Sequence, residues 1–203
     1  MNPMRLLYHP LSTFSQRVRI ALDEKGVACE LVDVDMAKRE HHGDEYRAKN
    51  PYARVPTLED DGLVLYESTA ILEYLEALHP TPALVPSTPR ERGLMAMHVK
   101  LCDLEIGVHT LTFIKPARFA PRDKWRVDEM QRARDGVNAH LRVLEAQVGD
   151  GWLVGDAFTL ADVCYAPFLR FLEELGLDAG PRVRAYAARL LLRPSVKRTW
   201  LAR

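Results

Sequence analysis

The sequence predicts an α/β domain followed by an all-helical domain. Over residues 1–80, short apolar runs typical of strands alternate with helical patterns. After residue 90 the strand patterns cease and only helical spacing remains. Between the two patterns, the stretch from His79 to Arg90 carries four prolines, which excludes a helix interior or a central strand. We therefore expect domains at residues 1–80 and 90–203, joined by a linker at 81–89.

The first domain is predicted to run strand, helix, strand, helix, strand, strand, helix. A strand, a helix and a second strand of this length imply a parallel pair joined by a right-handed crossover. The last two strands flank Asp60-Asp61-Gly62, a sequence typical of a hairpin turn. The expected strands are residues 4–8, 28–34, 55–59 and 63–66, and the expected helices are 15–25, 67–78 and a short, partly irregular helix within 35–49.

The second domain is predicted to contain helices at residues 90–116, 124–148, 159–175, 181–192 and 195–200. One of these helix starts carries a capping pattern. Thr159 stands at the N-cap and Asp162 three residues later, with Phe158 and Val163 placed as a hydrophobic staple. We interpret this motif as structural.

Composition indicates an ordinary globular protein of a reducing compartment. The chain has 203 residues, 47% apolar and 28% charged, with zero formal net charge, so nothing points to nucleic acid. Cys29, Cys102 and Cys164 lie scattered among apolar residues, without metal-ligand spacing, and are expected to be small buried hydrophobes. No apolar run is long enough to span a bilayer, and the N-terminal one is too short for a signal peptide. We expect a cytoplasmic protein without a membrane partner.

Charge is unevenly divided along the chain. Residues 1–80 carry 9 basic and 14 acidic side chains, a net charge of −5, and residues 81–203 carry 19 basic and 14 acidic ones, a net charge of +5. This division is consistent with a mildly basic substrate side or a complementary contact between subunits. Surface charge that has no such role is the alternative, and it is the favoured interpretation.

The segment from Asn50 to Leu58 places Val55-Pro56 at the head of a strand. Proline lacks an N–H and therefore fits the first residue of a strand or an edge. If the Val55–Pro56 peptide is cis, the turn leaves the main chain of Val55 able to pair with an extended peptide. The alternative is an ordinary trans proline that starts a strand.

A helix begins at Glu67-Ser68, directly after a strand. The free N–H groups of a helix start bind a carboxylate, and Glu67 beside them can pair with an ammonium group. The end of an α-amino acid carries both groups. The alternative is that both side chains only cap the helix.

The loop from Leu11 to Val18 links the first strand to the first helix, where α/β domains place their chemistry. A hydroxyl and a helix dipole at this point can stabilise a bound thiolate. Ser12, Thr13 and Ser15 all offer hydroxyls. Simple N-capping is the alternative, and because Ser15 fits it best, Ser12 is the freer candidate.

Together these segments resemble the glutathione transferase family over nearly the whole chain, most closely its serine-type classes such as phi, tau, theta and zeta. The resemblance implies a thioredoxin-like first domain that binds glutathione and a helical second domain that helps to bind a small apolar electrophile. It also implies a homodimer.

By this resemblance, Ser12 is the catalytic residue that hydrogen-bonds the glutathione sulfur, with Thr13 and Ser15 behind it. Tyr8 is a further rival because other classes use a tyrosine, but it falls in a predicted strand. Related classes with thiol-transferase activity keep a cysteine at the place of Ser12, and this chain has none near it.

The other glutathione contacts follow from the same resemblance. Val55-Pro56 matches the cis-proline pair whose valine main chain binds the cysteinyl part, and Glu67-Ser68 matches the pair that grips the γ-glutamyl end. His41 and Arg54 match residues near the glycine carboxylate. For His41 and its neighbour His42, solvated loop positions are the alternative, and a zinc site is rejected because further ligands at metal spacing are missing.

The resemblance implies a glutathione S-transferase, in which the glutathione thiolate attacks an electrophilic carbon held in an apolar pocket. Leu104, Val108, Leu111, Thr112 and Lys115 share one stripe of a predicted helix and either line this pocket or pack in the core. Two other functions stay open. One is a glutathione-dependent isomerase of the maleylacetoacetate type, and the other is a non-catalytic binding module like the stringent starvation proteins.

Overall fold

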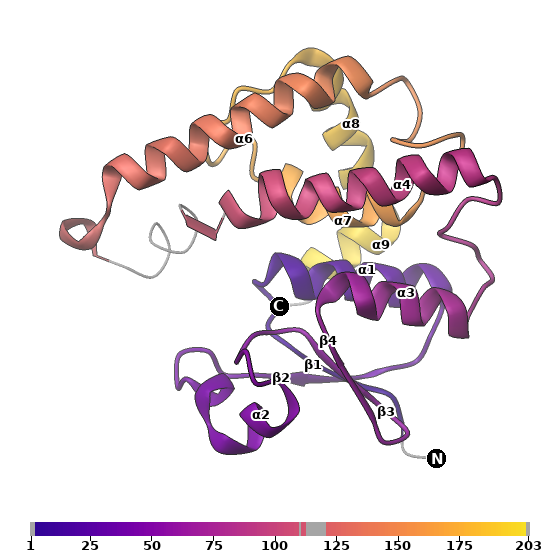
Figure 1. Cartoon of the computed structure of the whole chain (residues 1–203), viewed down its shortest axis with the longest axis vertical. Coiled ribbons are helices and arrows are strands. Elements are labelled where there is room, and N and C mark those ends of the chain that lie inside the picture. The colour runs from indigo at the N-terminus through magenta and orange to yellow at the C-terminus, as the bar shows by residue number, and fades with distance from the viewer. Residues whose placement is uncertain (1–2, 110, 113–120, 202–203) are drawn as a thin grey trace. The chain divides into compact units, whose positions relative to one another are not determined.

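The computed structural model of the chain describes residues 3–109, 111–112 and 121–201. It divides into two compact units (Figure 1). Unit 1 comprises Met1–Leu84 together with Arg193–Arg203, and unit 2 comprises Val85–Leu192. The chain therefore leaves the first unit, builds the second and returns to the first. This return of residues 193–203 is absent from the expected division at 1–80, 81–89 and 90–203.

Unit 1 is built on a four-stranded mixed sheet, in the order β2-β1-β3-β4. The strands are β1 (Arg5–Tyr8), β2 (Glu30–Asp33), β3 (Thr57–Asp60) and β4 (Leu63–Tyr66). β1 pairs in parallel with β2 and antiparallel with β3, which pairs antiparallel with β4. The predicted order of elements is confirmed. At the hairpin turn Asp61 and Gly62 both have positive φ, 43° and 86°, as a tight turn between twisted strands requires.

Helices cover both faces of this sheet. α1 (Thr13–Lys25) and α3 (Ser68–Leu78) pack side by side along one face (Figure 1). On the other face, α2 (Asp44–Lys49) follows the short 3₁₀ helix η1 (Glu40–His42), so the predicted irregular helix is confirmed. Tyr46 of α2 packs there against Leu7 of β1 and Val34.

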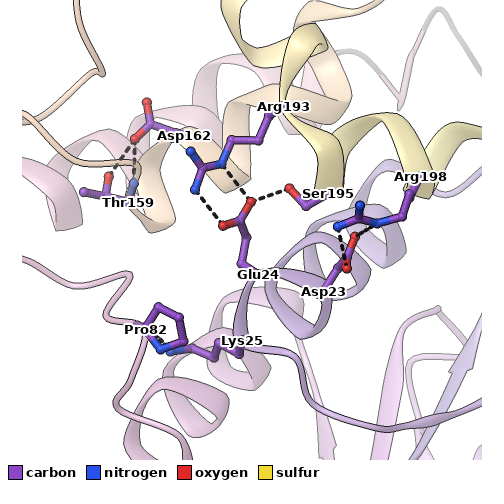
Figure 2. A network of polar contacts seen from close by, with 9 residues as sticks. All are labelled: Asp23, Glu24, Lys25, Pro82, Thr159, Asp162, Arg193, Ser195 and Arg198. Carbon is purple, nitrogen blue, oxygen red and sulfur yellow. Dashed lines mark hydrogen bonds and ion pairs between the residues drawn. The ribbon is translucent and has the colours of Figure 1, made fainter.

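A buried lysine fixes the end of α3 and the chain that follows it. Lys25 Nζ lies 2.6 Å from the Glu76 carboxylate and donates to the carbonyl of His79 at 2.7 Å. It also donates to the carbonyl of Pro82 at 2.9 Å (Figure 2). The last carbonyls of a helix have no partner within it, and a cation is a favourable one. This cluster holds the segment through which the chain leaves unit 1.

The C-terminal helix α9 (Pro194–Leu201) packs on α1. Arg193 forms a two-bond pair with Glu24, at 2.8 and 2.7 Å, and Ser195 donates to the same carboxylate. Arg198 pairs with Asp23 in the same manner, at 2.7 and 2.9 Å (Figure 2). Burial acts to raise the pKa of Glu24, but the hydrogen bonds from Arg193 and Ser195 outweigh it and hold the pKa below its ordinary value.

Helices are the only regular secondary structure among the described residues of unit 2. Its elements are α4 (Pro89–Leu101), the π-helix η2 (Cys102–Gly107), the 3₁₀ helix η3 (Arg122–Lys124), α6 (Val127–Gln147), α7 (Leu160–Leu169) and α8 (Pro181–Leu192). Every residue of α7 is buried, which makes this helix the centre of the unit. The helix predicted over 159–175 ends at Leu169, because the next amides bond to carbonyls three residues back instead of four.

The start of α7 is the structural capping motif that the sequence predicts. The Thr159 amide donates to Asp162 Oδ2 at 2.8 Å and the Thr159 hydroxyl at 3.0 Å. The other oxygen, Oδ1, accepts from the Leu153 amide at 3.0 Å and from the Tyr186 hydroxyl at 2.7 Å. Burial raises the pKa of Asp162, and these donors act in the opposite direction.

Two of the three cysteines are small buried residues, as predicted. Cys102 and Cys164 are fully buried, and Cys102 Sγ lies 3.4 Å from the carbonyl of Cys164. Cys29 is half-buried, and burial raises its pKa to about 11. In the described part of the chain, no helix is both long enough and apolar enough to span a bilayer. No three His, Cys, Asp or Glu side chains gather there as metal ligands.

Candidate active site

Four segments that carry the predicted site residues leave the sheet of unit 1 at one end. The register aligns Tyr8 at the end of β1 with Asp33 at the end of β2. It also aligns Leu7 with Thr57 at the start of β3, and Thr57 with Tyr66 at the end of β4. The loops that follow β1, β2 and β4, and the loop that precedes β3, therefore meet at this end. Ser12, His41, Val55 and Glu67 belong to these four loops.

Ser12 is the N-cap of α1, and its Oγ accepts a hydrogen bond from the Ser15 amide at 3.2 Å. The expectation that Ser15 fits the capping role best is wrong. Ser15 is fully buried in the first turn, and its Oγ lies 3.5 Å from the amide of His9. Capping uses a lone pair of Ser12 Oγ and leaves its proton available to donate outward. The capping role and a role toward a ligand are therefore compatible.

Among the remaining hydroxyl candidates, Thr13 and Ser15 are buried, and Tyr8 is half-buried like Ser12. Thr13 is buried in the first turn of α1. Tyr8 is the last residue of β1, as predicted, and the Arg19 guanidinium lies over its ring at 5.1 Å from the centroid. Gln16 donates to the carbonyl of Pro10 at 2.8 Å and so ties the loop to α1. Ser12 is only half-buried and stays the foremost candidate.

The loop before β3 presents the main chain of Val55. Its side chain packs against the cluster of Leu7, Val34 and Tyr46. The Tyr46 hydroxyl and the Asn50 amide donate to the carbonyl of Arg54, at 2.7 and 2.8 Å, which fixes the loop. The Val55–Pro56 peptide is cis, Pro56 is buried and the Arg54 side chain is exposed. The strand begins at Thr57, two residues later than predicted.

Glu67 occupies an unusual backbone conformation at the start of α3. Its φ is 71° and its ψ is 115°, a region that residues with a Cβ rarely adopt. Such conformations cost about 1–3 kcal/mol and gather at ligand clamps. In the described structure its exposed side chain forms no capping hydrogen bond, so the alternative of a purely capping role is wrong for Glu67.

Ser68 is the first residue of α3 and is buried beside Glu67. Its Oγ accepts a hydrogen bond from Nη1 of Arg17, at 3.4 Å. Arg17 belongs to α1, is fully buried, and carries its guanidinium 4.9 Å from the centroid of the Phe14 ring. The first amides of α3 point away from the helix, as in any helix start, and favour an anion there.

His41 lies in η1, and its side chain is buried. The alternative of a solvated loop position is therefore wrong for His41 and holds for His42, which is exposed. The two rings lie 4.0 Å apart between centroids. His42 Nδ1 lies 3.3 Å from Nη2 of Arg47.

In unit 2, three of the residues predicted to line the electrophile pocket are apolar and exposed. Leu104, Val108 and Leu111 are 48%, 58% and 48% exposed. Core packing is therefore wrong for these three. Thr112 is half-buried, and Lys115 lies outside the described residues. We call Leu104, Val108 and Leu111 the apolar stripe.

Comparison with known proteins assigns the family. Residues 6–83 match the glutathione S-transferase N-terminal domain, and residues 127–189 match the glutathione S-transferase C-terminal domain. The maleylacetoacetate isomerase of Pseudomonas aeruginosa is 39% identical to this chain, over 91% of the chain and 89% of that protein. The chain belongs to the glutathione S-transferase family.

Other relatives differ in their functions. The stringent starvation protein A homologue of Coxiella burnetii is 33% identical, over 88% of this chain and 80% of its own length. Among solved structures, a glutathione transferase homologue from Sulfitobacter with bound glutathione has a TM-score of 0.84 and 27% identity, and covers 98% of this chain and 97% of that one. Proteins named as isomerases, as transferases and as a starvation protein homologue are thus all similar in sequence to this chain.

Sequence reasoning missed one residue that contacts the candidate site. Arg17 lies within the segment from Leu11 to Val18 and is not among the residues predicted for the site, although its guanidinium contacts Ser68. A signal was present in the sequence. Arg17 falls within an otherwise buried helix, and arginine is almost never fully buried unless it is paired. That pattern indicates a buried arginine with a partner but does not name the partner, which is 51 residues away.

Proposed function

We propose that this chain is a glutathione-dependent enzyme that adds the glutathione thiolate to a small electrophilic substrate. The observation that carries the proposal is the start of α3, where an acidic residue in a strained backbone conformation stands beside a buried hydroxyl and free helix amides. An α-amino acid end offers an ammonium group to the first and a carboxylate to the others. The γ-glutamyl end of glutathione has this shape, and the family assignment supports it.

Glutathione then extends along the end of the sheet. Glu67 and Ser68 hold the γ-glutamyl end, and the main chain of Val55 before Pro56 pairs with the cysteinyl part. This pairing is supported by the side chain of Val55, whose packing against Leu7, Val34 and Tyr46 fixes the position of its backbone. Arg54, whose side chain is exposed, and His41 serve the glycine carboxylate.

Ser12 donates its hydroxyl proton to the sulfur. The dipole of α1 adds a positive partial charge at the same point, and both effects favour the thiolate over the thiol. The Ser15 amide supports this orientation, since it occupies a lone pair of Ser12 Oγ. The main contributions of the protein are the ionisation of the thiol and its positioning against the electrophile.

The relatives support two reactions that share this first step. In conjugation, the thiolate forms a bond to carbon and either a leaving group departs or a proton is taken up, which gives a stable thioether. In isomerisation of a cis alkene, the thiolate adds to one carbon, the new single bond rotates, and elimination returns the thiolate and the trans alkene. The 39% identity to a maleylacetoacetate isomerase supports isomerisation as the alternative to conjugation.

The apolar stripe supports a hydrophobic electrophile, because exposed leucine and valine side chains lower the free energy of an apolar ligand beside them. A homodimer belongs to the same proposal. It is supported by the opposite net charges of residues 1–80 and 81–203, which suit contacts between unlike halves of two subunits.

Calorimetric titration tests the glutathione site. Glutathione is titrated into the native protein, into Glu67→Ala and into Glu73→Ala, which removes an exposed carboxylate from the same helix. We expect one site per chain, at least tenfold weaker in Glu67→Ala and unchanged in Glu73→Ala. If the native protein takes up no glutathione, the proposal fails and the non-catalytic binding module, as in the starvation-protein relative, replaces it.

A further inference from the structure

Arg17 places a permanent positive charge next to Ser68, the first residue of α3. Its side chain has no exposed surface, and Nη1 lies 3.4 Å from Ser68 Oγ. A buried charge is screened little by salt, so its field acts on any anion at the neighbouring helix start. The charge adds to the partial positive charge of the α3 amides.

The contact also decides where the Ser68 proton can point. A guanidinium group has five N–H donors and no acceptor, so Ser68 Oγ must be the acceptor of this bond. The single hydroxyl proton of Ser68 then has to find its acceptor elsewhere. A carboxylate at the start of α3 is such an acceptor, and a charge-assisted bond to it is stronger than one between neutral groups.

We propose that Arg17 is a positioning residue that turns the Ser68 hydroxyl outward, as a donor to the α-carboxylate of the γ-glutamyl group. This inference rests on the proposed glutathione site and adds to it a residue that the ligand does not touch. The Phe14 ring, 4.9 Å from the guanidinium carbon, contributes to holding the planar group in place.

The same helix supplies a matched control. Arg19 is also buried, at 8% exposure, but its guanidinium lies over Tyr8, and Nη1 donates to the carbonyl of Thr199 at 3.2 Å. Replacing either arginine by methionine removes a buried cation from α1. Among the hydrogen bonds described for Arg17 and Arg19, only the one from Arg17 reaches Ser68.

The test compares two peptides that differ only in the α-carboxylate: glutathione and 4-aminobutanoyl-cysteinylglycine. Their affinities are measured by calorimetry for the native protein, Arg17→Met, Arg17→Lys and Arg19→Met. We expect the native preference for glutathione to fall about tenfold in Arg17→Met. Lysine should restore part of it, since it keeps the charge and the donors but not the planar geometry. Arg19→Met should keep the full preference.

A second measurement separates positioning from folding. In a Ser68→Ala background, Arg17→Met should lower the preference by clearly less than it does in the native protein, because the hydroxyl that Arg17 orients is absent and only the field of its charge is lost. Equal loss of affinity for both peptides, or an unchanged preference in Arg17→Met, would overturn the inference and leave the glutathione site standing. If Arg17→Met does not fold, the test rests on Arg17→Lys. A preference for glutathione in Arg17→Lys equal to that of the native protein would overturn the inference. A native protein that binds neither peptide overturns the site and the inference together.

Discussion

The starts of α3 and α7 use the same kinds of side chain in opposite ways. At α7, both oxygens of Asp162 accept two hydrogen bonds each, from Thr159, Leu153 and Tyr186. At α3, the Glu67 side chain is exposed and forms no capping bond within the described structure, and its backbone is strained. One carboxylate is saturated by hydrogen bonds from its own chain, and the other is exposed and caps no helix amide in the described structure.

Residue type at a helix start therefore does not separate a structural motif from a binding motif. The two kinds of motif differ in whether the carboxylate is buried and whether its acceptor sites are already occupied by hydrogen bonds. A buried carboxylate with all its acceptor sites occupied contributes to stability and can bind nothing further. An exposed carboxylate held in a costly conformation contributes nothing evident to stability, and such cost is typical of functional sites. The starts of α7, α1 and α3 allow this difference between structural and binding carboxylates and hydroxyls to be measured.

The largest effect is expected at α7. Asp162→Ala leaves the amides of Leu153 and Thr159 and the Tyr186 hydroxyl without their acceptor in the core. Each such group costs about 1–3 kcal/mol, so we expect the free energy of unfolding to fall by roughly 3–5 kcal/mol. Urea denaturation measures it, with the exposed Asp156→Ala as control, expected within about 0.5 kcal/mol of native. A loss below about 1 kcal/mol for Asp162→Ala would contradict saturation as the source of stability.

An intermediate effect is expected at α1, where Ser12 both caps the helix and keeps a proton to donate. Ser12→Ala removes both functions, while Ser12→Gly removes the hydroxyl but remains an acceptable N-cap. We expect a stability loss of about 1 kcal/mol for alanine and only a few tenths for glycine. Both should move half-maximal activity at saturating glutathione toward the free-thiol pKa of about 8.5. Rates measured across pH check this, and an unshifted profile in both variants would remove Ser12 from the mechanism.

The smallest change in stability is expected at α3, and it has the opposite sign. Glu67→Gly relieves the contact between Cβ and the backbone at φ 71° and should raise the free energy of unfolding by up to about 1 kcal/mol. Glu67→Ala keeps a Cβ and should show no such gain. Both should weaken glutathione binding by at least tenfold. Thermal unfolding and calorimetry on the same samples check the pair, and equal stability of the two variants would mean that the backbone carries no strain.

Much of the fold could be predicted from the sequence, because its signals are local. The period of apolar residues identified the strands and most helices, and the Asp60-Asp61-Gly62 turn and the Thr159 and Asp162 cap were visible as short motifs. The first turn of α1 was placed two residues late, since Ser12, Thr13 and Ser15 are all suitable caps. The π-helix η2 was read as ordinary helix, because apolar spacing does not reveal which carbonyl an amide bonds.

The contacts that sequence could not give are those between distant residues. Arg17 and Ser68 are 51 positions apart, and Glu24 and Arg193 are 169 apart. A single sequence shows that each carries charge or a hydroxyl, but not which one it meets. Ser12 and Glu67 could be proposed as site residues because each stands at a helix start that its own segment of sequence reveals. The candidate site was incomplete where one helix supports another.

The return of α9 to unit 1 has a consequence for how the protein is made. During synthesis, the outer face of α1 has no partner for Glu24 and Asp23 until Arg193 and Arg198 leave the ribosome. The unit that holds the proposed glutathione site is thus begun first and completed last. A premature stop codon shortly before Arg193 would leave unit 2 nearly complete and would remove from unit 1 its C-terminal segment.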